Sequence, residues 1–461
     1  MGSTDVSEKK YLFTNRDLHK LIIPLFIEQF LAIFVGLADS VMVASVGETA
    51  VSAVSLIDTI MILLINMFTA LATGGAIVAG QALGRRKQDE GCEAVEQTFL
   101  FAAVFSTVIM FLVYAGKWFI LHVVFGQIEP EVMRNCSIYL LIVTASIPFL
   151  AVYNSGAAMY RAMGDSRTPM LMSLAMNGMN LIGNAILLYG VGMGVEGAAI
   201  PTMLSRVFAG VWMLFCIRDN RKMLHVRTLS GIRLKWPVLK KILHLGIPYS
   251  LENSMFQLGK ILVLSLVSGF GTSSIAANAV CNSVCSFAIL GGMSMGYALS
   301  AVSAQCVGAG DYEQVRFYTR KLIKYAYGAI FLMNLLIILA LPFIIRIYNL
   351  SFETGEMARR IIIYHAVLAV LIWTPSFTLP NTLRAANDVG FCMWVSIVSM
   401  WIFRIGFSFI LGKYAGLGVF GVWVAMTVDW AVRMVFFIFR YRGTRWEFKK
   451  HKFLKPNGIE L

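Results

Sequence analysis

The sequence repeats its own pattern at a constant offset of 224 residues, and it does so within long apolar segments. Glu28 in IPLFIEQF corresponds to Glu252 in IPYSLENS, and the Ile-Pro pair before each keeps the same register. The correspondence continues through Gln81 and Gln305. Two halves that insert in the same orientation require an even number of crossings per half, with a pseudo-twofold axis along the membrane normal. This arrangement is typical of transporters.

Composition assigns the chain to the membrane. Of its 461 residues, 58% are hydrophobic and 14% are charged, and the mean hydropathy is +0.73. One soluble core cannot bury that much apolar surface, so we expect an all-α polytopic membrane protein. The polar segment before the first apolar stretch lacks a small-residue cleavage site, so that stretch is expected to stay as a helix.

A window of about twenty residues moved along the chain predicts about twelve transmembrane helices, six in each half. We predict an amino-terminal six-helix bundle over 1–217, a cytoplasmic linker over 218–241, a carboxy-terminal six-helix bundle over 242–440 and a basic cytoplasmic tail over 441–461. The spans are predicted at 19–46, 51–82, 94–122, 133–160, 168–190, 195–217, 241–270, 275–306, 321–348, 357–382, 390–412 and 418–440.

Loop charge alternates from one connection to the next. The chain has a net charge of +14. Connections such as LGRRKQDEG and RAMGDSRTP are rich in Lys and Arg, whereas FGQIEPEV and YNLSFETGE are not. Because Lys and Arg accumulate in cytoplasmic loops, both termini are expected in the cytoplasm. The positive charge thus reports topology, and no nucleic-acid partner is expected. We expect a multi-pass protein of the plasma membrane, in a prokaryote the inner or cell membrane.

Two GxGxxG strings, at 192–197 and 416–421, match a dinucleotide-binding fingerprint in spacing. Neither follows a strand, and each joins two apolar segments at equivalent positions of the repeat, so we interpret both as tight turns. The chain also offers no P-loop, no HExxH and no nucleophile with a base. We therefore expect no enzyme, no catalytic residue, no cofactor and no metal site other than one for Na⁺.

Ionisable side chains inside the predicted spans indicate where function resides, because each costs a few kcal/mol unless it is paired or faces water. Asp39 lies about three helical turns after Glu28, on nearly the same helix face. Glu28 is matched by Glu252, so a structural role competes with a functional one: capping of backbone groups that the preceding prolines leave free. The position equivalent to Asp39 is Val263. Asp39 is therefore the stronger candidate for binding H⁺ or Na⁺.

Three asparagines form a polar stripe on the fifth predicted span. Asn177, Asn180 and Asn184 are spaced by three and four residues, so their amides share one helix face. Thr202 in the next span can add a hydroxyl group. Amide oxygens can ligate Na⁺ or bind a protonated carboxyl group, but asparagines in membranes also join helices by hydrogen bonds. Both interpretations stay open from the sequence.

The seventh predicted span carries a second polar face. Glu252, Phe256 and Lys260 follow the spacing i, i+4, i+8. Together with Glu28 and Asn177 from the first half, they are candidates for binding substrate or a second ion.

Further charged residues lie within the spans. Asp429 and Arg433 are four residues apart, in the orientation that favours an internal salt bridge, and we interpret them as structural. Asp58, Arg206 and Arg404 have no partner that spacing identifies, so the sequence assigns them no role.

These strings together resemble the multidrug and toxic compound extrusion (MATE) family over nearly the whole chain. GLADSVMVASVG at 36–47 resembles the family's first-helix signature, and GQALGRRKQDEG, YRAMGDSRTPM, NLIGNAILLYG and GVEGAAIPTMLS fall where members carry similar strings. The resemblance implies two six-helix bundles around a V-shaped cavity that alternates between outward and inward states. It also implies export of organic cations or other amphiphiles in exchange for H⁺ or Na⁺.

The resemblance also implies roles for individual residues. Asp39 matches the family's first-helix carboxylate, and Asn180, Asn184 and Thr202 match positions that complete the amino-lobe cation site in some members. Some members place an Asp where Asn184 stands and an acid where Phe256 stands. A two-carboxylate Na⁺ site and an ion site in the carboxy lobe are therefore disfavoured, and H⁺ is favoured as the coupling ion.

Other functions fit parts of the sequence. A flippase for a lipid-linked sugar, from the same superfamily, would place several basic residues in the cavity for a pyrophosphate, and Arg206, Arg404 and Lys260 leave this open. A channel or receptor is disfavoured by the duplicated halves with a single long linker. The expected partners are small cationic or amphiphilic molecules and membrane lipids, and the monomer is the expected functional unit.

Overall fold

The computed structural model describes residues 11–126, 128–227, 233–348 and 350–447, which form helices joined by turns, with no strand. Within these residues, nine helices are long and apolar enough to cross a membrane, and two bent helix pairs qualify as single spans. A further helix, α9 (Trp236–Ser268), has the length of a span, but its middle carries Glu252, Asn253, Gln257 and Lys260. The predicted all-α polytopic fold is confirmed.

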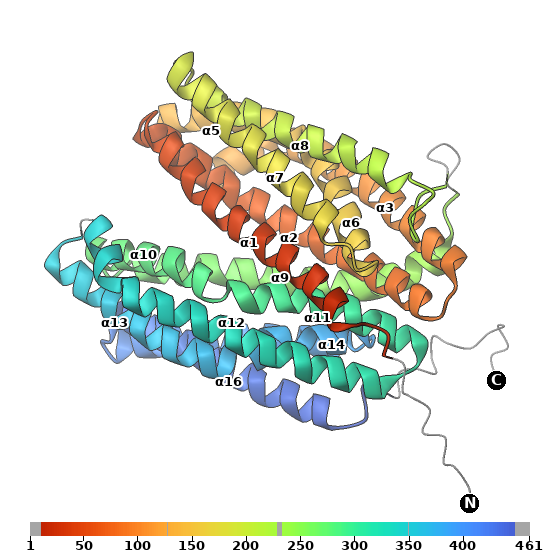
Figure 1. Ribbon diagram of the computed structural model, residues 1–461. Helices are drawn as coiled ribbons and strands as arrows, with labels where there is room; N and C mark the ends of the chain where they lie inside the picture. The colour runs from red at the N-terminus through yellow and green to blue at the C-terminus, as the bar shows by residue number, and fades with distance from the viewer. Residues whose placement is uncertain (1–10, 127, 228–232, 349, 448–461) are drawn as a thin grey trace, which may run out of the picture.

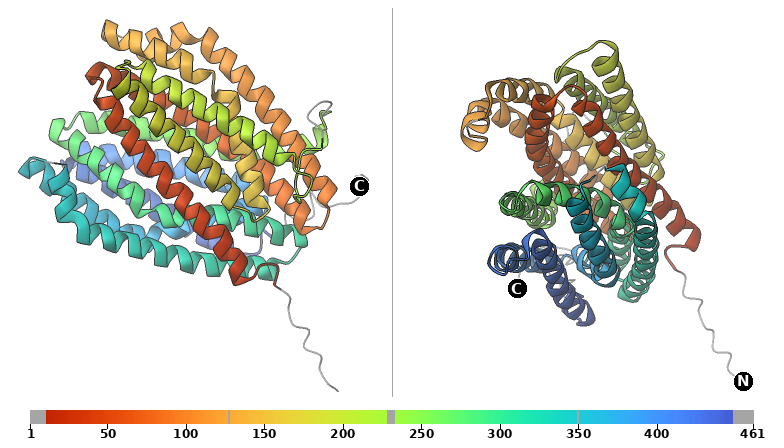
Figure 2. Two further views of the ribbon diagram at one scale, coloured as in Figure 1. Left: turned by 45° about the horizontal axis from the view of Figure 1, so that its top comes forward. Right: turned by 90° about the vertical axis from the view of Figure 1, so that its left-hand side faces the viewer.

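The two halves of the chain form two groups of helices, which we call the amino lobe and the carboxy lobe. In Figure 1 the amino lobe, red to yellow-green, lies above the carboxy lobe, green to blue, and Figure 2 shows the same grouping from two other directions. The amino lobe contains α1 (Asn15–Ala44), α2 (Glu48–Gly84), α3 (Gln88–Ala115), α5 (Pro130–Thr144), α6 (Ile147–Ala162), α7 (Arg167–Asn184) with its π-helical continuation η2 (Ala185–Gly190), and α8 (Glu196–Ile217).

The carboxy lobe repeats this arrangement, with more of its helices broken. It contains α9, α10 (Thr272–Ala288), α11 (Leu290–Ala309), α12 (Tyr312–Ile347), α13 (Phe352–Leu368), η3 (Ala369–Thr378), α14 (Pro380–Ala385), α15 (Val389–Ser399), η4 (Met400–Gly406), η5 (Ser408–Tyr414) and α16 (Gly418–Arg442). Because α9 begins at Trp236, the predicted linker over 218–241 overlaps its first turns. Residues 228–232 of that linker and 448–461 of the predicted tail lie outside the described residues.

The sequence repeat is also a repeat of backbone conformation. Gly192 and Gly416, which open the two GxGxxG strings, have φ angles of 73° and 71°, a conformation that side chains with a Cβ atom rarely adopt. Gly192 follows η2 and Gly416 follows η5, so each turns the chain between two helices. The interpretation of both strings as tight turns is confirmed.

The lobes contact each other at the end of the bundle where α1 begins and α16 ends, which we call the terminal end (Figure 1). The side-chain amide of Gln81, on α2, donates to the carbonyl oxygen of Ala385 at 2.8 Å. The side-chain amide of Gln305, on α11, donates to the carbonyl oxygen of Ala162 at 2.6 Å. Gln81 and Gln305 are the pair matched by the repeat, so the two hydrogen bonds are one contact made twice across the pseudo-twofold axis.

Glycines allow the backbones of α2 and α11 to meet beside these glutamines. A Cβ atom on Gly84 would collide with the carbonyl oxygen of Gln305, and one on Gly308 would collide with that of Gln81. Near by, the Tyr318 hydroxyl group of α12 donates to the carbonyl oxygen of Phe13 at 2.7 Å, just before α1. The described part of the chain is thus closed between the lobes at the terminal end.

Candidate functional site

The amino lobe contains a cavity of about 380 Å³. Its lining includes most of the amino-half residues predicted from the sequence, namely Glu28, Asp39, Asn177, Asn180 and Thr202. Asn177 donates to the hydroxyl oxygen of Ser173 at 3.2 Å. Asn177 and Asn180 of the fifth-span stripe therefore face the same space as the first-span carboxylates. Helical spacing predicted a shared face within each span, and the resemblance to MATE proteins implied that Asp39 and Asn180 meet.

A chain of hydrogen bonds links the four residues predicted to couple an ion. The amide group of Asn184, at the end of α7, donates to the carboxylate of Asp39 on α1. The amide of Asn180 donates to the Thr202 hydroxyl oxygen at 2.9 Å, and that hydroxyl donates to the carbonyl oxygen of Ala198 at 2.8 Å. Asn184 is fully buried, and among the described residues its Oδ1 atom accepts no hydrogen bond. One carboxylate thus joins α1 to the α7–α8 pair.

A second carboxylate lines the same cavity as Asp39, and sequence reasoning did not place it there. Asp58, on α2, accepts a hydrogen bond from the Tyr139 hydroxyl group at 3.4 Å. The positive charge of Arg206, on α8, acts on both Asp39 and Asp58, and the two carboxylates repel each other. The cluster of two aspartates and one arginine carries one excess negative charge when both acids are ionised. The sequence did offer one indication of this cluster, because Asp58 and Arg206 are charged residues inside predicted spans.

The matched glutamates form ion pairs instead of capping the backbone near the prolines, which corrects the structural role considered from the sequence. Glu28 lies 2.5 Å from Arg161, and Glu252 lies 2.6 Å from Arg384. The two arginines begin the strings RAMGD and RAAND in the two halves. Sequence reasoning missed them because the predicted spans end at 160 and 382, which assigned both arginines to loops.

The carboxy lobe contains a cavity of about 350 Å³, lined by Glu252, Phe256 and Lys260 from one face of α9. The face predicted from the i, i+4, i+8 spacing is therefore a cavity wall. Thr69 and Tyr297 border both this cavity and the amino-lobe cavity. The two spaces consequently meet along the middle of the protein.

Arg404 and Arg433 line the same cavity, and Asp429 lies next to Arg433. Asp429 and Arg433 form the predicted internal salt bridge at 2.9 Å, and the Ser399 hydroxyl group donates to Asp429 at 2.5 Å. Arg404, to which the sequence assigned no role, lies over the ring of Phe256, 5.3 Å from its centroid. Arg404 belongs to the π-helical segment η4, in which side chains depart from ordinary helical spacing.

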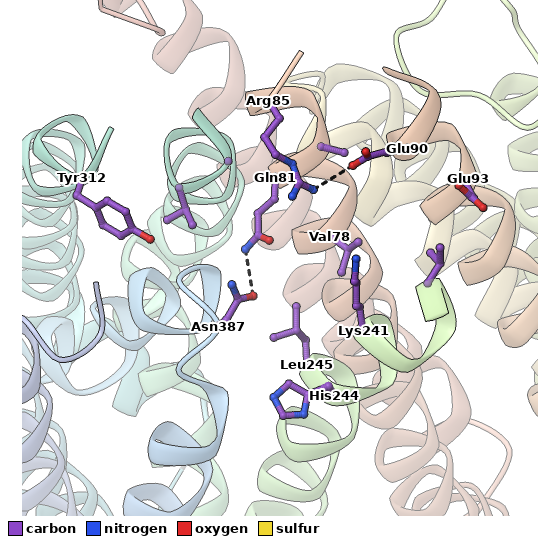
Figure 3. A pocket seen from close by; sticks show the side chains of 14 residues that line it. Val78, Gln81, Arg85, Glu90, Glu93, Lys241, His244, Leu245, Tyr312 and Asn387 are labelled. Atoms are coloured by element: carbon purple, nitrogen blue, oxygen red, sulfur yellow. Dashed lines mark hydrogen bonds and ion pairs between the residues drawn. The ribbon is translucent and has the colours of Figure 1, made fainter. Parts of the chain in front are cut away.

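A third cavity, of about 280 Å³, lies at the terminal end (Figure 3). Its lining includes Gln81, which bonds the Asn387 side chain at 3.1 Å, and the pair Arg85–Glu90 at 3.5 Å. Lys241 and His244 of α9 complete its polar wall. This space belongs to the closed contact between the lobes and contains none of the predicted site residues.

The family follows from a comparison of the whole chain with known families. The model of the family described as MatE matches residues 24–186 and 248–410, one match in each lobe, and the two matches cover more than half of the chain. The chain belongs to the MatE family. The predicted resemblance to MATE proteins is confirmed, and the protein is a multi-pass member of a transporter family.

Relatives of this MatE protein span almost its whole length. It is 24% identical over 439 residues to the "Uncharacterized transporter YisQ" of Bacillus subtilis (strain 168), covering 93% of this chain and 94% of the relative. It is 26% identical over 450 residues to the "Probable multidrug resistance protein YoeA" of the same organism, covering 94% and 95%. A solved structure described as "Crystal structure of MATE in the bent conformation" matches with a TM-score of 0.85 and 20% identity, covering 94% and 96%. That likeness establishes the shared two-lobe fold.

Proposed function

We propose that this MatE protein exports amphiphilic or cationic organic molecules by antiport with H⁺ or Na⁺, with its central cavity opening alternately to the two sides of the membrane. The names of relatives such as the probable multidrug resistance protein YoeA support drug export. The observation that carries the antiport is the hydrogen bond from Asn184 to Asp39 beside Asp58 and Arg206. In this proposal both termini are cytoplasmic, the protein lies in a prokaryotic plasma membrane, and the monomer is the functional unit.

The charge of the cluster explains how one cation could drive the transport cycle. Arg206 offsets one of the two negative charges of Asp39 and Asp58, so one bound H⁺ or Na⁺ brings the cluster to neutrality. The cluster joins α1, α2, α7 and α8, because Asp39, Asp58, Asn184 and Arg206 come from those four helices. Ion binding therefore changes the interactions between helices of the amino lobe. It drives transport only if the ion binds the two access states with unequal affinity.

The direction of the hydrogen bonds favours H⁺ over Na⁺. Na⁺ requires several oxygen ligands, but the Asn184 group that faces Asp39 is the amide N–H. The side-chain oxygen of Asn180 already accepts a hydrogen bond from the Asn184 amide at 3.4 Å. Of the two asparagine side-chain oxygens, only that of Asn184 accepts no hydrogen bond among the described residues. A proton needs only the carboxylate, so it can bind without turning either amide.

Efflux from proteoliposomes under separately imposed pH and Na⁺ gradients tests this proposal. Purified protein is reconstituted with a fluorescent organic cation, and Asp39→Asn is compared with the wild type and with Asp219→Asn, which changes an exposed loop aspartate. Asp39→Asn keeps the size and hydrogen bonding of the side chain but removes its charge. We expect gradient-driven efflux in the wild type and in Asp219→Asn, and none above the protein-free leak in Asp39→Asn. Wild-type efflux in Asp39→Asn would remove Asp39 from the mechanism.

The second candidate function is a flippase for a lipid-linked sugar. It is favoured by the basic side chains of Lys260 and Arg404 on the carboxy-lobe cavity, which could face a pyrophosphate. Gradient-independent translocation of a fluorescent lipid-linked pyrophosphate, with no efflux of the organic cation, would support this candidate over antiport.

A further inference from the structure

The carboxy-lobe cavity carries more positive charge than its acids compensate. Glu252 pairs with Arg384, and Asp429 pairs with Arg433. Lys260 and Arg404 also line the cavity, and among the described residues neither has a carboxylate within 4.0 Å. Arg404 interacts with Asp429 only at longer range, and Asp429 already pairs with Arg433. Two cationic groups of the wall thus lack a close partner.

Protein cations also occupy the aromatic surface of the cavity. The guanidinium groups of Arg404 and Arg433 lie 5.3 Å and 5.6 Å from the centroid of the Phe256 ring. Arg433 lies 5.3 Å from the ring of Phe377 as well. Cation–π contacts that an organic cation would need are therefore already made by the protein, and like-charge repulsion opposes a cationic ligand here. An anionic group attached to an aromatic body fits the same wall.

The repeat shows that the fold does not require these two charges. At the offset of 224 residues, Lys260 corresponds to Gly36 and Arg404 corresponds to Asn180. The amino lobe builds the same pair of helices with these uncharged residues. Conversely, Asp39 of the amino lobe corresponds to Val263. The two lobes thus share a scaffold and differ in the sign of the unpaired charge that they present to the middle of the protein.

We propose that the carboxy-lobe cavity binds the anionic group of the transported molecule, an aromatic carboxylate, through Lys260 and Arg404. The ring system of the substrate packs beside Phe256 and Phe377. This inference rests on the proposed export function. It narrows the proposed substrate class, amphiphilic or cationic organic molecules, to amphiphiles that carry a carboxylate and are therefore anionic or zwitterionic. In a zwitterion, the cationic end would extend past Thr69 and Tyr297 toward the acidic amino-lobe cavity, because both residues border both spaces.

Binding of rhodamine B and its ethyl ester to the purified full-length protein tests the assignment. The two dyes share one aromatic cation, and only rhodamine B has a free carboxylate. Fluorescence anisotropy in detergent gives the Kd of each dye without any transport step. We expect the wild type to bind rhodamine B about tenfold more tightly than the ester, which is the fold-change typical of one charge-assisted contact.

Variants link this preference to the two residues. Lys260→Gln and Arg404→Gln should each bring the ratio of the two Kd values close to one. Lys324→Gln, which changes an exposed lysine of α12 outside the cavity, should keep the wild-type ratio. If Arg404→Gln does not fold, Lys260→Gln decides, because Lys260 is exposed on the cavity wall and makes no ion pair that folding would lose.

The inference is overturned if the wild type binds both dyes equally, or if the preference survives the Lys260→Gln substitution. Displacement of rhodamine B by inorganic pyrophosphate but not by benzoate would also overturn it, because the site would then recognise phosphate. If the wild type showed no gradient-driven efflux but kept its preference for rhodamine B over the ester, the proposed antiport would be contradicted and the carboxylate site would not.

Discussion

The guanidinium of Arg161, on α6, lies 2.5 Å from the carboxylate of Glu28, on α1, inside the amino lobe. Arg161 also lies over the ring of Tyr297 of the carboxy lobe, 5.1 Å from its centroid. The repeat-related pair, Arg384 and Glu252, is 2.6 Å apart in the carboxy lobe. Two buried ion pairs thus hold equivalent helices together, and the amino-lobe pair lies where the lobes meet.

Glu28→Gln should destabilise the protein strongly. The side chains of Arg161 and Glu28 are 13% and 7% exposed, so removal of the carboxylate leaves a buried guanidinium without its counterion. Breaking one partner of a buried pair typically costs about 3–5 kcal/mol. Thermal unfolding in detergent, followed by the loss of the monodisperse peak in size-exclusion chromatography, measures the effect. Glu356→Gln, in the exposed pair with Arg359, is the matched control and should change the midpoint little. Equal midpoints for both variants would contradict this prediction.

Asp58→Asn should impair ion-driven efflux although sequence reasoning gave Asp58 no role. If the excess charge belongs to Asp39 and Asp58 together, neutralising either one leaves a cluster that Arg206 already balances. The driving ion then loses its preference for one access state. Initial efflux rates in proteoliposomes should fall by on the order of tenfold or more, a loss of at least about 1.4 kcal/mol of coupling. Asp58→Glu, which restores the charge, should recover part of the rate. An unchanged rate in Asp58→Asn would show that Asp39 couples alone.

Asn180→Ala and Asn184→Ala separate the two coupling ions. With H⁺, loss of either amide changes the surroundings of the Asp39 carboxylate, so the pH profile of efflux should shift without any requirement for Na⁺. With Na⁺, each variant should instead raise the Na⁺ concentration needed for half-maximal efflux, because an oxygen ligand is lost. Asn135→Ala, which changes a half-buried amide of α5 that lines neither the amino-lobe nor the carboxy-lobe cavity, serves as the control. Wild-type efflux that fails under a pH gradient but recovers with an inward Na⁺ gradient would exclude H⁺ as the sole driving ion.

Cysteine labelling in intact cells tests the orientation. Glu129 precedes α5 and Glu353 lies in the first turn of α13, and both are exposed at the end of the bundle opposite the terminal end. Glu129→Cys and Glu353→Cys should react with an impermeant maleimide from outside, whereas Gln88→Cys, at the terminal end, should react only after permeabilisation. The half-buried Cys216 is replaced by serine in all variants to lower the background. Outside labelling of Gln88→Cys would reverse the proposed orientation.

The sequence by itself determined the all-helical fold, the twofold repeat and the turns at Gly192 and Gly416. These features are local: hydropathy depends on a window of neighbours, and a positive φ angle depends on a single glycine. It also predicted that Asn177 and Asn180 share one helix face, because helical spacing sets which side chains of one helix point the same way. The grouping of Asp39 with Asn180 and Thr202 on one space was implied by the resemblance to MATE proteins.

Apart from Asp429 and Arg433, which lie four residues apart on one helix, only the tertiary structure decided which charged groups meet. Arg161 reaches Glu28 across 133 positions of the chain, and Asp58 and Arg206 join Asp39 from different helices. The predicted spans ended at residues 160 and 382, so Arg161 and Arg384 were assigned to loops. In the structure α6 and α14 continue past these positions, and both arginines form buried ion pairs. Periodicity assigns a side chain to a face of its own helix, but the partner on that face depends on how helices pack and on π-helical turns that shift the register. Contacts between distant segments are therefore a property of the assembled bundle.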